Sequence, residues 1–352
     1  MSDSRQIPIT HRRYPGNNYN ARGIYLITLC TEHRRPLLGE LCGDTAAQAH
    51  ICPTKLGRAV LRCWYDIPSF HKERAAQKSL RTGRECSREI QIISSQLMPD
   101  HFHGIIFIKE DMDISLGQVL CGFMTGCTQT YHRMIEAAYT LPTRQILGGV
   151  NASVYMPTKP LPTLSSLWEK GYHDRPLRGP GQLQRMIDYV QDNPRRLWMR
   201  RHSGRFFRLH RGVRVGAHVF EAKGELGILQ RPMHAVHVRR RFSEAERRAY
   251  MNGCILAARQ GKALVGAFIS EYEQQVRAVA LAEGHPVIQL TTDVLTECYK
   301  PSGVLFDACS AGHLLLLSQQ EGECGFSRRI TRAECNMLNT LAEEMAEGVR
   351  LL

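Results

Sequence analysis

The stretch Ser94-Ser95-Gln96-Leu97-Met98-Pro99-Asp100-His101-Phe102-His103-Gly104-Ile105-Ile106-Phe107-Ile108 decides the fold of the first half of the chain. It predicts two strands joined by a Pro-Asp turn, because the residues after Gly104 are β-branched or aromatic and too few for a helix. Side chains alternate between the two faces of a strand. His101 and His103 are therefore expected to project to one side, and Phe102 to the other, into a core.

His101 and His103 are candidate ligands of a divalent metal. Neutral imidazole nitrogens commonly bind first-row metals, and a strand fixes their separation. Two histidines at this spacing are more often solvated or hydrogen-bonded residues than ligands. Here the pair opens a buried strand directly after a turn, where ligands are both accessible and rigidly held. That position favours the metal-site interpretation.

A tyrosine near the end of a later predicted helix is the candidate nucleophile. The helix covers about 181–190, and Tyr189 and Asn193 lie four residues apart, on one helical face. Pro194 biases Asn193 away from the helical region, so the helix is expected to end there. A half-buried structural tyrosine is the alternative interpretation of Tyr189, and the Asn-Pro-Arg-Arg that follows argues against it.

The two segments together resemble the REP-associated and related single-tyrosine transposases, a family of HUH endonucleases. Leu97-Met98-Pro99-Asp100-His101-Phe102-His103 is similar to the family's Met-Pro-Asn/Asp-His-x-His segment, and Tyr189-Val190-Gln191-Asp192-Asn193-Pro194-Arg195-Arg196 to its tyrosine followed by Asn-Pro and a basic residue. The resemblance implies that Tyr189 is catalytic and that His101, His103 and Asn193 bind the metal. It also implies cleavage and strand transfer of single-stranded or hairpin DNA through a 5′-phosphotyrosine intermediate.

Two other functions compete with a transposase. A relaxase or replication-initiator nuclease uses the same histidine and tyrosine chemistry, although the single tyrosine and the Met-Pro-Asp lead-in favour the transposase. A domesticated, catalytically inactive regulator would only bind a DNA sequence or hairpin. Magnesium or manganese is the expected metal in either enzyme, and the sequence leaves open whether two chains form a homodimer that shares the site.

The expected fold of residues 1–215 is α+β. Strands and helices are predicted in the order strand, helix, strand, strand, helix, strand, helix, which is that of a ferredoxin-like domain with an antiparallel sheet and helices on one face. The predicted elements are a strand at 23–31, a helix at about 55–74, the strand pair at the histidines, a helix at 115–138, a strand at 167–178 and the helix of Tyr189. Residues 140–166 are expected to form a loop near the active site.

A dense arginine run surrounds the candidate nucleophile. Residues 175–214 contain arginines at 175, 178, 185, 195, 196, 200, 201, 205, 208, 211 and 214, but only two acids, Asp188 and Asp192. Guanidinium forks bind phosphates, and the interleaved aromatic residues can stack on unpaired bases. Such a run is usually solvated surface, but beside Tyr189 it favours a DNA groove. The candidate DNA-binding residues are Arg175, Arg178, Arg195, Arg196, Arg200 and Arg201.

Residues 216–352 predict a second, smaller domain. Ser243 with Glu246 forms a capping-box pattern before a helix at 243–260. Strands are expected at 263–269, 286–290 and 313–317, and helices at 271–283 and 332–349. This alternation predicts a three-layer α/β domain with a parallel sheet, similar to a Rossmann-like appendage of some of these transposases. Turns after its strands could bind a phosphate, but no Gly-x-Gly-x-x-Gly is present, so no cofactor-binding residue is expected.

Composition limits the partners. The formal net charge of +13 favours an anionic partner such as nucleic acid. The twelve cysteines include no Cys-x-x-Cys pair, which leaves a zinc ribbon unsupported. Apolar runs are too short to span a membrane, and the N-terminus has no apolar core typical of a signal peptide. A cytoplasmic protein with reduced thiols and no membrane partner is therefore expected.

Overall fold

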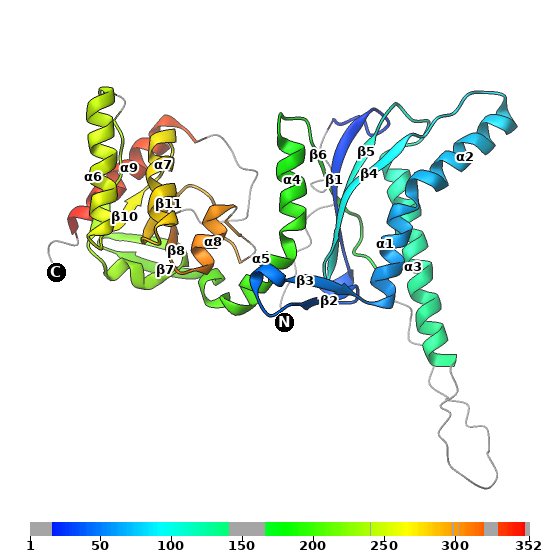
Figure 1. Ribbon diagram of the computed structural model, residues 1–352, viewed down its shortest axis with the longest axis horizontal. Coiled ribbons are helices and arrows are strands. Elements are labelled where there is room, and N and C mark those ends of the chain that lie inside the picture. Colours follow the sequence, from blue (N-terminus) through cyan, green and yellow to red (C-terminus); the bar gives the residue numbers. More distant parts are fainter. Residues whose placement is uncertain are drawn as a thin grey trace, which may run out of the picture. The chain divides into compact units, whose positions relative to one another are not determined.

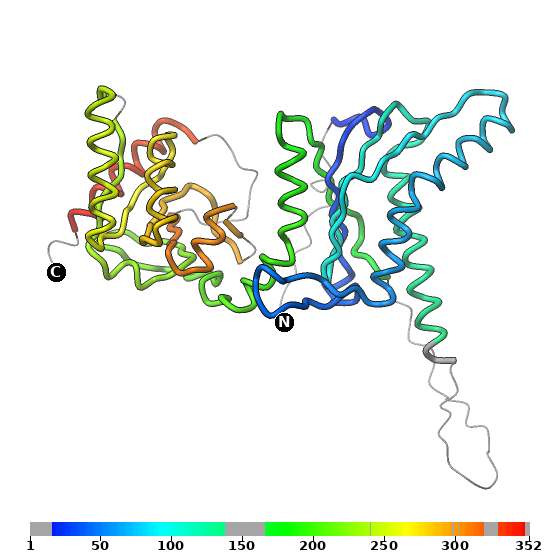
Figure 2. Tube along the Cα trace, viewed as in Figure 1, coloured from blue at the N-terminus to red at the C-terminus, as the bar shows by residue number. Residues whose placement is uncertain are grey.

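The computed structural model describes residues 16–140, 166–239, 241–297, 299–301, 303–319 and 330–348. The chain forms two compact units, Met1–Trp198 and Met199–Leu352, and Figure 2 traces its path through both. The division lies earlier than the boundary after residue 215 expected from composition, because β7 (His210–Val215) pairs with β8 (His218–Gly224) in the second unit. Residues 141–165, the larger part of the loop predicted near the active site, lie outside the described ranges.

The first unit contains an antiparallel sheet whose strands lie in the order β4-β5-β1-β6 (Figure 1). The strands are β1 (Gly23–Cys30), β4 (Ile90–Leu97), β5 (His101–Ile108) and β6 (His173–Pro176). β5 pairs with β1 and β4, so the histidine strand is central. The strands and helices of this sheet follow one another along the chain in the predicted order.

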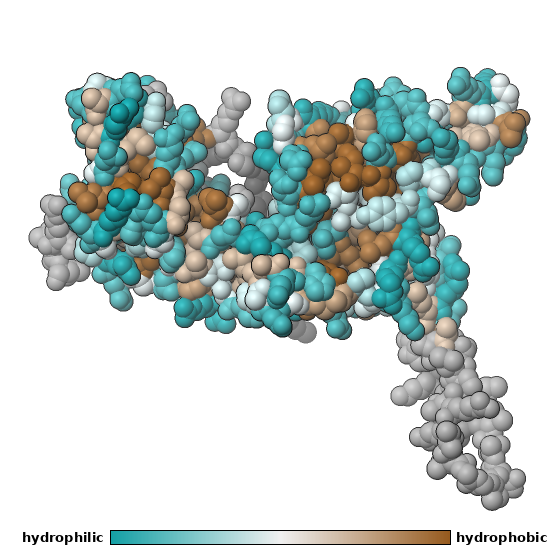
Figure 3. Space-filling view, in the orientation of Figure 1, coloured by the Kyte–Doolittle hydropathy of each residue, from teal (hydrophilic) through white to brown (hydrophobic). Residues whose placement is uncertain are grey.

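Both faces of this sheet are covered by helices. The expectation of helices on one face is wrong for α4 (Gln182–Gln191), whose Val190 packs with Leu26 and Ile105. The other face meets α1 (Lys55–Tyr65), α2 (Ile67–Thr82) and α3 (Leu116–Thr140). β5 contributes apolar residues to the cores on both faces, and both faces therefore need cover. In Figure 3, apolar surface gathers between α4 and the strands.

Two local features of the first unit differ from the sequence expectation. The single helix predicted at 55–74 is two helices, broken at Asp66, with a proline in the first turn of α2. α2 continues to Thr82 and ends at Gly83, which adopts the left-handed conformation. A short hairpin of β2 (Gly39–Cys42) and β3 (His50–Pro53) was not predicted, because strands of four residues carry too little alternation to be recognised.

The absence of a side chain at Gly104 is required by the core. A Cβ atom there would lie 2.2 Å from the indole of Trp64, which is fully buried and also contacts Phe102 edge to face. We expect Gly104→Ala to lower the free energy of unfolding by about 1–3 kcal/mol through overpacking. Gly122→Ala is the control, because a Cβ at this helical position meets nothing within 4 Å. Urea unfolding compares the two variants, and equal stability would contradict the packing argument.

The sheet of the second unit is mixed, not wholly parallel as predicted. Its order is β7-β8-β12-β11-β10-β9, with β9 to β12 parallel and β8 antiparallel to β12. The parallel strands are β9 (Met233–Ala235), β10 (Ala263–Gly266), β11 (Val287–Thr291) and β12 (Leu314–Ser318). The β7–β8 hairpin was not predicted, because charged residues and glycines interrupt the apolar pattern of both strands.

Helices cover both faces of this second sheet. α6 (Glu244–Arg259), α7 (Glu271–Ala282) and α8 (Val304–Ser310) contribute to one core, and α9 (Arg332–Gly348) to the other. The capping box of Ser243 and Glu246 is confirmed. Within the described ranges, no helix has both the length and the apolar character needed to cross a membrane.

Candidate active site

The two histidines of β5 lie side by side on the sheet face that α4 covers. Their ring centroids are 4.9 Å apart. His103 is buried, with 6% of its surface exposed, whereas His101 is partly exposed. Phe102 is fully buried on the opposite face, in the core around Trp64. The predicted alternation of the strand is therefore confirmed.

Each imidazole has a hydrogen-bond partner at Nδ1. His101 Nδ1 lies 2.6 Å from Asp100 Oδ1, and His103 Nδ1 lies 2.8 Å from Thr28 Oγ1. Burial raises the pKa of Asp100, but the hydrogen bond and charge of His101 and the charge of Arg34 outweigh it and leave the pKa lowered. The ionised carboxylate can only accept, so His101 carries its proton on Nδ1. Such a ring presents the Nε2 lone pair to a ligand.

Sequence reasoning missed these two supporting residues for different reasons. Asp100 is adjacent to His101 in the sequence and could have been proposed from the Pro-Asp-His order. Thr28 lies on β1, and only the register of the sheet pairs it with His103. Thr28 is also paired on its other side, with His173 of β6, so that His103, Thr28 and His173 lie next to one another across three strands. Directly opposite residues share a face, so His173 belongs to the candidate active-site face.

Tyr189 is brought to the histidines by α4. Its ring centroid is 6.1 Å from that of His103, and 39% of its surface is exposed. Val190, the next residue, is fully buried against the sheet and holds this end of the helix in place. An accessible phenol and two imidazoles therefore lie together on one face, which is the arrangement that the sequence motifs predicted.

α4 ends at Gln191, Asp192 is its C-cap, and Asn193 is the first residue of α5 (Asn193–His202). The predicted helix end is confirmed, but a second helix starts at once. The Asn193 side-chain nitrogen Nδ2 donates to the backbone oxygens of Tyr189, at 2.9 Å, and Val190, at 3.3 Å. The amide therefore satisfies carbonyl groups that the end of α4 leaves without helical partners. Coordination of a metal by its oxygen stays a prediction.

The six candidate DNA-binding arginines fall into different environments. Arg196 is buried, with 9% exposed, and its guanidinium carbon lies 5.7 Å from the Tyr189 ring centroid. Arg195 binds the Asp192 carboxylate through Nε, at 2.5 Å, and through a terminal nitrogen, at 3.0 Å. Three of the others, Arg175, Arg178 and Arg201, are exposed, and Arg200 is partly exposed. Arg196 is thus placed as a neighbour of Tyr189 and not as free basic surface.

The second unit has no open phosphate site at the turn after β10. Glu273, in the first turn of α7, is buried and accepts hydrogen bonds from the backbone nitrogens of Val238, Ile269 and Ser270 at 2.9–3.0 Å. Backbone N–H groups at a helix N-terminus are what a phosphate would bind. The protein's own carboxylate takes these donors, which weakens the phosphate interpretation of this turn.

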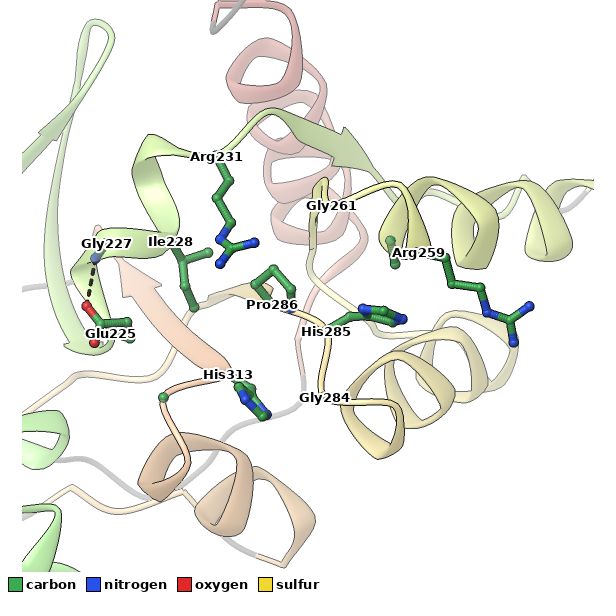
Figure 4. A pocket seen from close by; sticks show the side chains of 12 residues that line it. Glu225, Gly227, Ile228, Arg231, Arg259, Gly261, Gly284, His285, Pro286 and His313 are labelled. Carbon is green, nitrogen blue, oxygen red and sulfur yellow. Dashed lines mark hydrogen bonds between the residues drawn. The ribbon is translucent and has the colours of Figure 1, made fainter.

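A cavity of about 400 Å³ lies at the end of the second sheet where its parallel strands begin (Figure 4). Its basic lining residues are Arg231, Arg259, His285 and His313. α6, α7 and α8 end near it, so their carbonyl ends give this edge a negative character that the basic side chains offset. Ligands of open parallel sheets bind at the carboxyl ends of the strands, and this is the amino end. We therefore assign no ligand to the cavity.

Comparisons with known proteins give weak matches. No model of a known protein family matches the chain. An uncharacterized protein of Haemophilus influenzae is 23% identical over 197 residues, which is 55% of this chain and 94% of that protein. A solved structure of a REP-associated tyrosine transposase bound to a REP hairpin is 13% identical. It covers 52% of this chain and 72% of its own, with a TM-score of 0.28, and so does not establish a shared fold.

Proposed function

We propose that this protein is a metal-dependent transposase that cleaves single-stranded or hairpin DNA and joins the strand to Tyr189. The observation that carries the proposal is the approach of an exposed phenol on α4 to two neighbouring imidazoles on β5. The order of strands and helices, and the strand order β4-β5-β1-β6, also suit the ferredoxin-like fold expected of such an enzyme.

The donor set suits a divalent metal at His101 and His103. Both rings have their Nδ1 atoms engaged by side chains, which is the arrangement that orients Nε2 toward a metal. Asn193 Oδ1 is the proposed third ligand, because the hydrogen bonds of the amide to the backbone use only its nitrogen. Magnesium or manganese held there would polarise the scissile phosphate and offset charge on its oxygens.

The chain's own residues supply the nucleophile and position it. The Tyr189 oxygen attacks phosphorus and the bond from phosphorus to the 3′ oxygen breaks, so that the phenol gives up one proton and the leaving 3′ oxygen takes one up. The products are a 5′-phosphotyrosine and a free 3′-hydroxyl, which can attack the link in reverse, so that no nucleotide hydrolysis is needed. Arg196, whose guanidinium lies close to the Tyr189 ring, would offset negative charge at the reacting phosphate. Arg175, Arg178 and Arg201 offer exposed charge for the rest of the DNA backbone.

The hydrogen bond between Thr28 and His103 gives a test of the metal site. We expect Thr28→Val to weaken manganese binding by about 10–100-fold, because His103 loses the partner that orients its ring. Thr128→Val is the control, since it removes a hydroxyl that bonds only a carbonyl within α3. Titration with manganese measures both affinities. An unchanged affinity in Thr28→Val would contradict the proposed role of this hydrogen bond in orienting His103 as a metal ligand.

The proposed reaction is tested by looking for its covalent intermediate. Labelled hairpin DNA is incubated with the full chain and magnesium or manganese, and the protein is digested to locate any attached nucleotide. We expect the label on the peptide that contains Tyr189, and none when the metal is chelated. Hairpin binding without an adduct under all metal conditions would favour the catalytically inactive DNA-binding regulator.

A further inference from the structure

A second group of ligating side chains lies on the β2–β3 hairpin, apart from the candidate active site. The ligand atoms of Cys42, His50 and Cys52 all lie within 4.8 Å of one another. His50 Nε2 is 3.5 Å from Cys52 Sγ, and the Cys42 thiol donates a hydrogen bond to the backbone oxygen of Glu40 at 3.7 Å. In the part of the chain that the structure describes, this is the one group of three histidine, cysteine or acidic side chains with such geometry.

The register of the hairpin creates this cluster. Cys42 and His50 are direct partners across the ladder, and Cys52 lies two residues beyond His50 on the same strand face. The connection between the strands, residues 43–49, needs Gly43, which has a φ of +105° and where a Cβ would lie 2.5 Å from the Gln48 oxygen. The three side chains are thus held on one face by the backbone geometry of the hairpin.

The histidine of the cluster is oriented by a second contact. His50 Nδ1 lies 2.8 Å from the backbone oxygen of Gln48, a carbonyl that can only accept. Nδ1 therefore carries the proton, and Nε2 presents its lone pair toward the sulfur of Cys52. This arrangement, with one ring nitrogen donating to a carbonyl and the other facing the ligand position, is common in metal-binding histidines.

We propose that Cys42, His50 and Cys52 bind one zinc ion. Two thiolates and an imidazole form a soft sulfur and nitrogen set, which selects zinc over magnesium or manganese. The site is therefore chemically distinct from the oxygen-seeking metal expected at His101 and His103. Three protein ligands leave the fourth tetrahedral position open for water.

Zinc at this position would stabilise a weak element of the fold. An isolated two-stranded hairpin is at best marginally stable, and metal binding adds directly to folding free energy. The hairpin turn is tied to α5, because Trp198 Nε1 donates to the Gly43 oxygen at 3.1 Å. α5 also carries Arg196, the neighbour of Tyr189. If the proposed catalytic role of Tyr189 holds, zinc binding would stabilise the position of α5 next to the nucleophile.

Cobalt substitution tests this site independently of the candidate active site. The full chain is purified under reducing conditions, depleted of metal with a chelator and titrated with Co²⁺ or Zn²⁺. We expect a sulfur-to-cobalt charge-transfer band, displaced by an equivalent of zinc. His101 and His103 cannot give that band, because they bring no sulfur, and the cysteine variants below assign it to the hairpin. The result therefore does not depend on whether Tyr189 cleaves DNA.

Three variants complete the test. The Cys42→Ser, Cys52→Ser double variant and the His50→Ala variant are expected to lose the cobalt band and to hold one zinc ion fewer per chain by elemental analysis. Cys121→Ser, which replaces an exposed cysteine on α3, is expected to keep both. The proposal is overturned if the wild-type chain shows no sulfur-to-cobalt band, or if the double variant retains it. Unchanged circular dichroism confirms that the variants remain folded.

Discussion

Tyr189→Phe is expected to abolish DNA cleavage and to leave hairpin binding intact. Loss of a covalent nucleophile commonly lowers turnover by about 10⁴-fold or more, because no neighbouring group replaces the attacking atom. The phenyl ring keeps its contacts with His103 and Arg196, so the fold and the DNA surface stay in place. Cleavage is measured on labelled hairpin DNA, and binding by retardation of the same DNA in a gel.

Tyr272→Phe is the matched control. Tyr272 is also 39% exposed, lies on a helix and has an arginine over its ring, with Arg247 at 4.3 Å from the centroid. It lies in the second unit, with no proposed role in the reaction. Full activity in Tyr272→Phe together with loss in Tyr189→Phe isolates the hydroxyl at position 189. Cleavage that persists in Tyr189→Phe would exclude Tyr189 as the nucleophile.

Replacement of the histidines is expected to have the second largest effect. Lewis-acid stabilisation of a phosphate in the transition state is worth several kcal/mol, so His101→Ala and His103→Gln should each lower cleavage by about a hundredfold or more. Raising the manganese concentration should restore part of the activity in His101→Ala, because one imidazole remains. Single-turnover cleavage at several metal concentrations measures both effects.

His218→Ala is the control for His101→Ala. Like His101, it pairs with a carboxylate, since its Nε2 lies 2.8 Å from Glu344 Oε2. The His218→Ala variant tests whether loss of any histidine–carboxylate contact lowers cleavage. Metal-independent cleavage by either β5 variant at the wild-type rate would contradict the proposed metal site.

The sequence was most informative where local pattern and structure coincide. Alternation in 101–108 identified the central strand and placed Phe102 opposite the histidines, and the Asn-Pro step identified the end of the helix of Tyr189. These features depend on residues close together in the chain. The capping pattern of Ser243 and Glu246 is of the same kind, because both hydrogen bonds form within one helical turn.

What the sequence did not reveal depends on register between distant segments. Thr28 meets His103 only because β1 pairs with β5 in one alignment. The Cys42, His50 and Cys52 cluster follows from the register of a hairpin too short to show alternation. Helix cover on the second sheet face was not predicted, because only the packing of Val190 against Leu26 and Ile105 reveals it. Arg196 was grouped with surface arginines because composition does not distinguish a buried guanidinium from an exposed one.

Glu273 has a consequence for how the second unit could change its chemistry. Its carboxylate occupies the donors that a phosphate would need at the start of α7. A single replacement that removes this carboxylate would leave Val238, Ile269 and Ser270 with unmet donors beside a positive helix end. The same carboxylate therefore fixes the start of α7 and keeps anions away from it, and its loss would cost stability because Glu273 is buried and its three backbone donors would lose their partner.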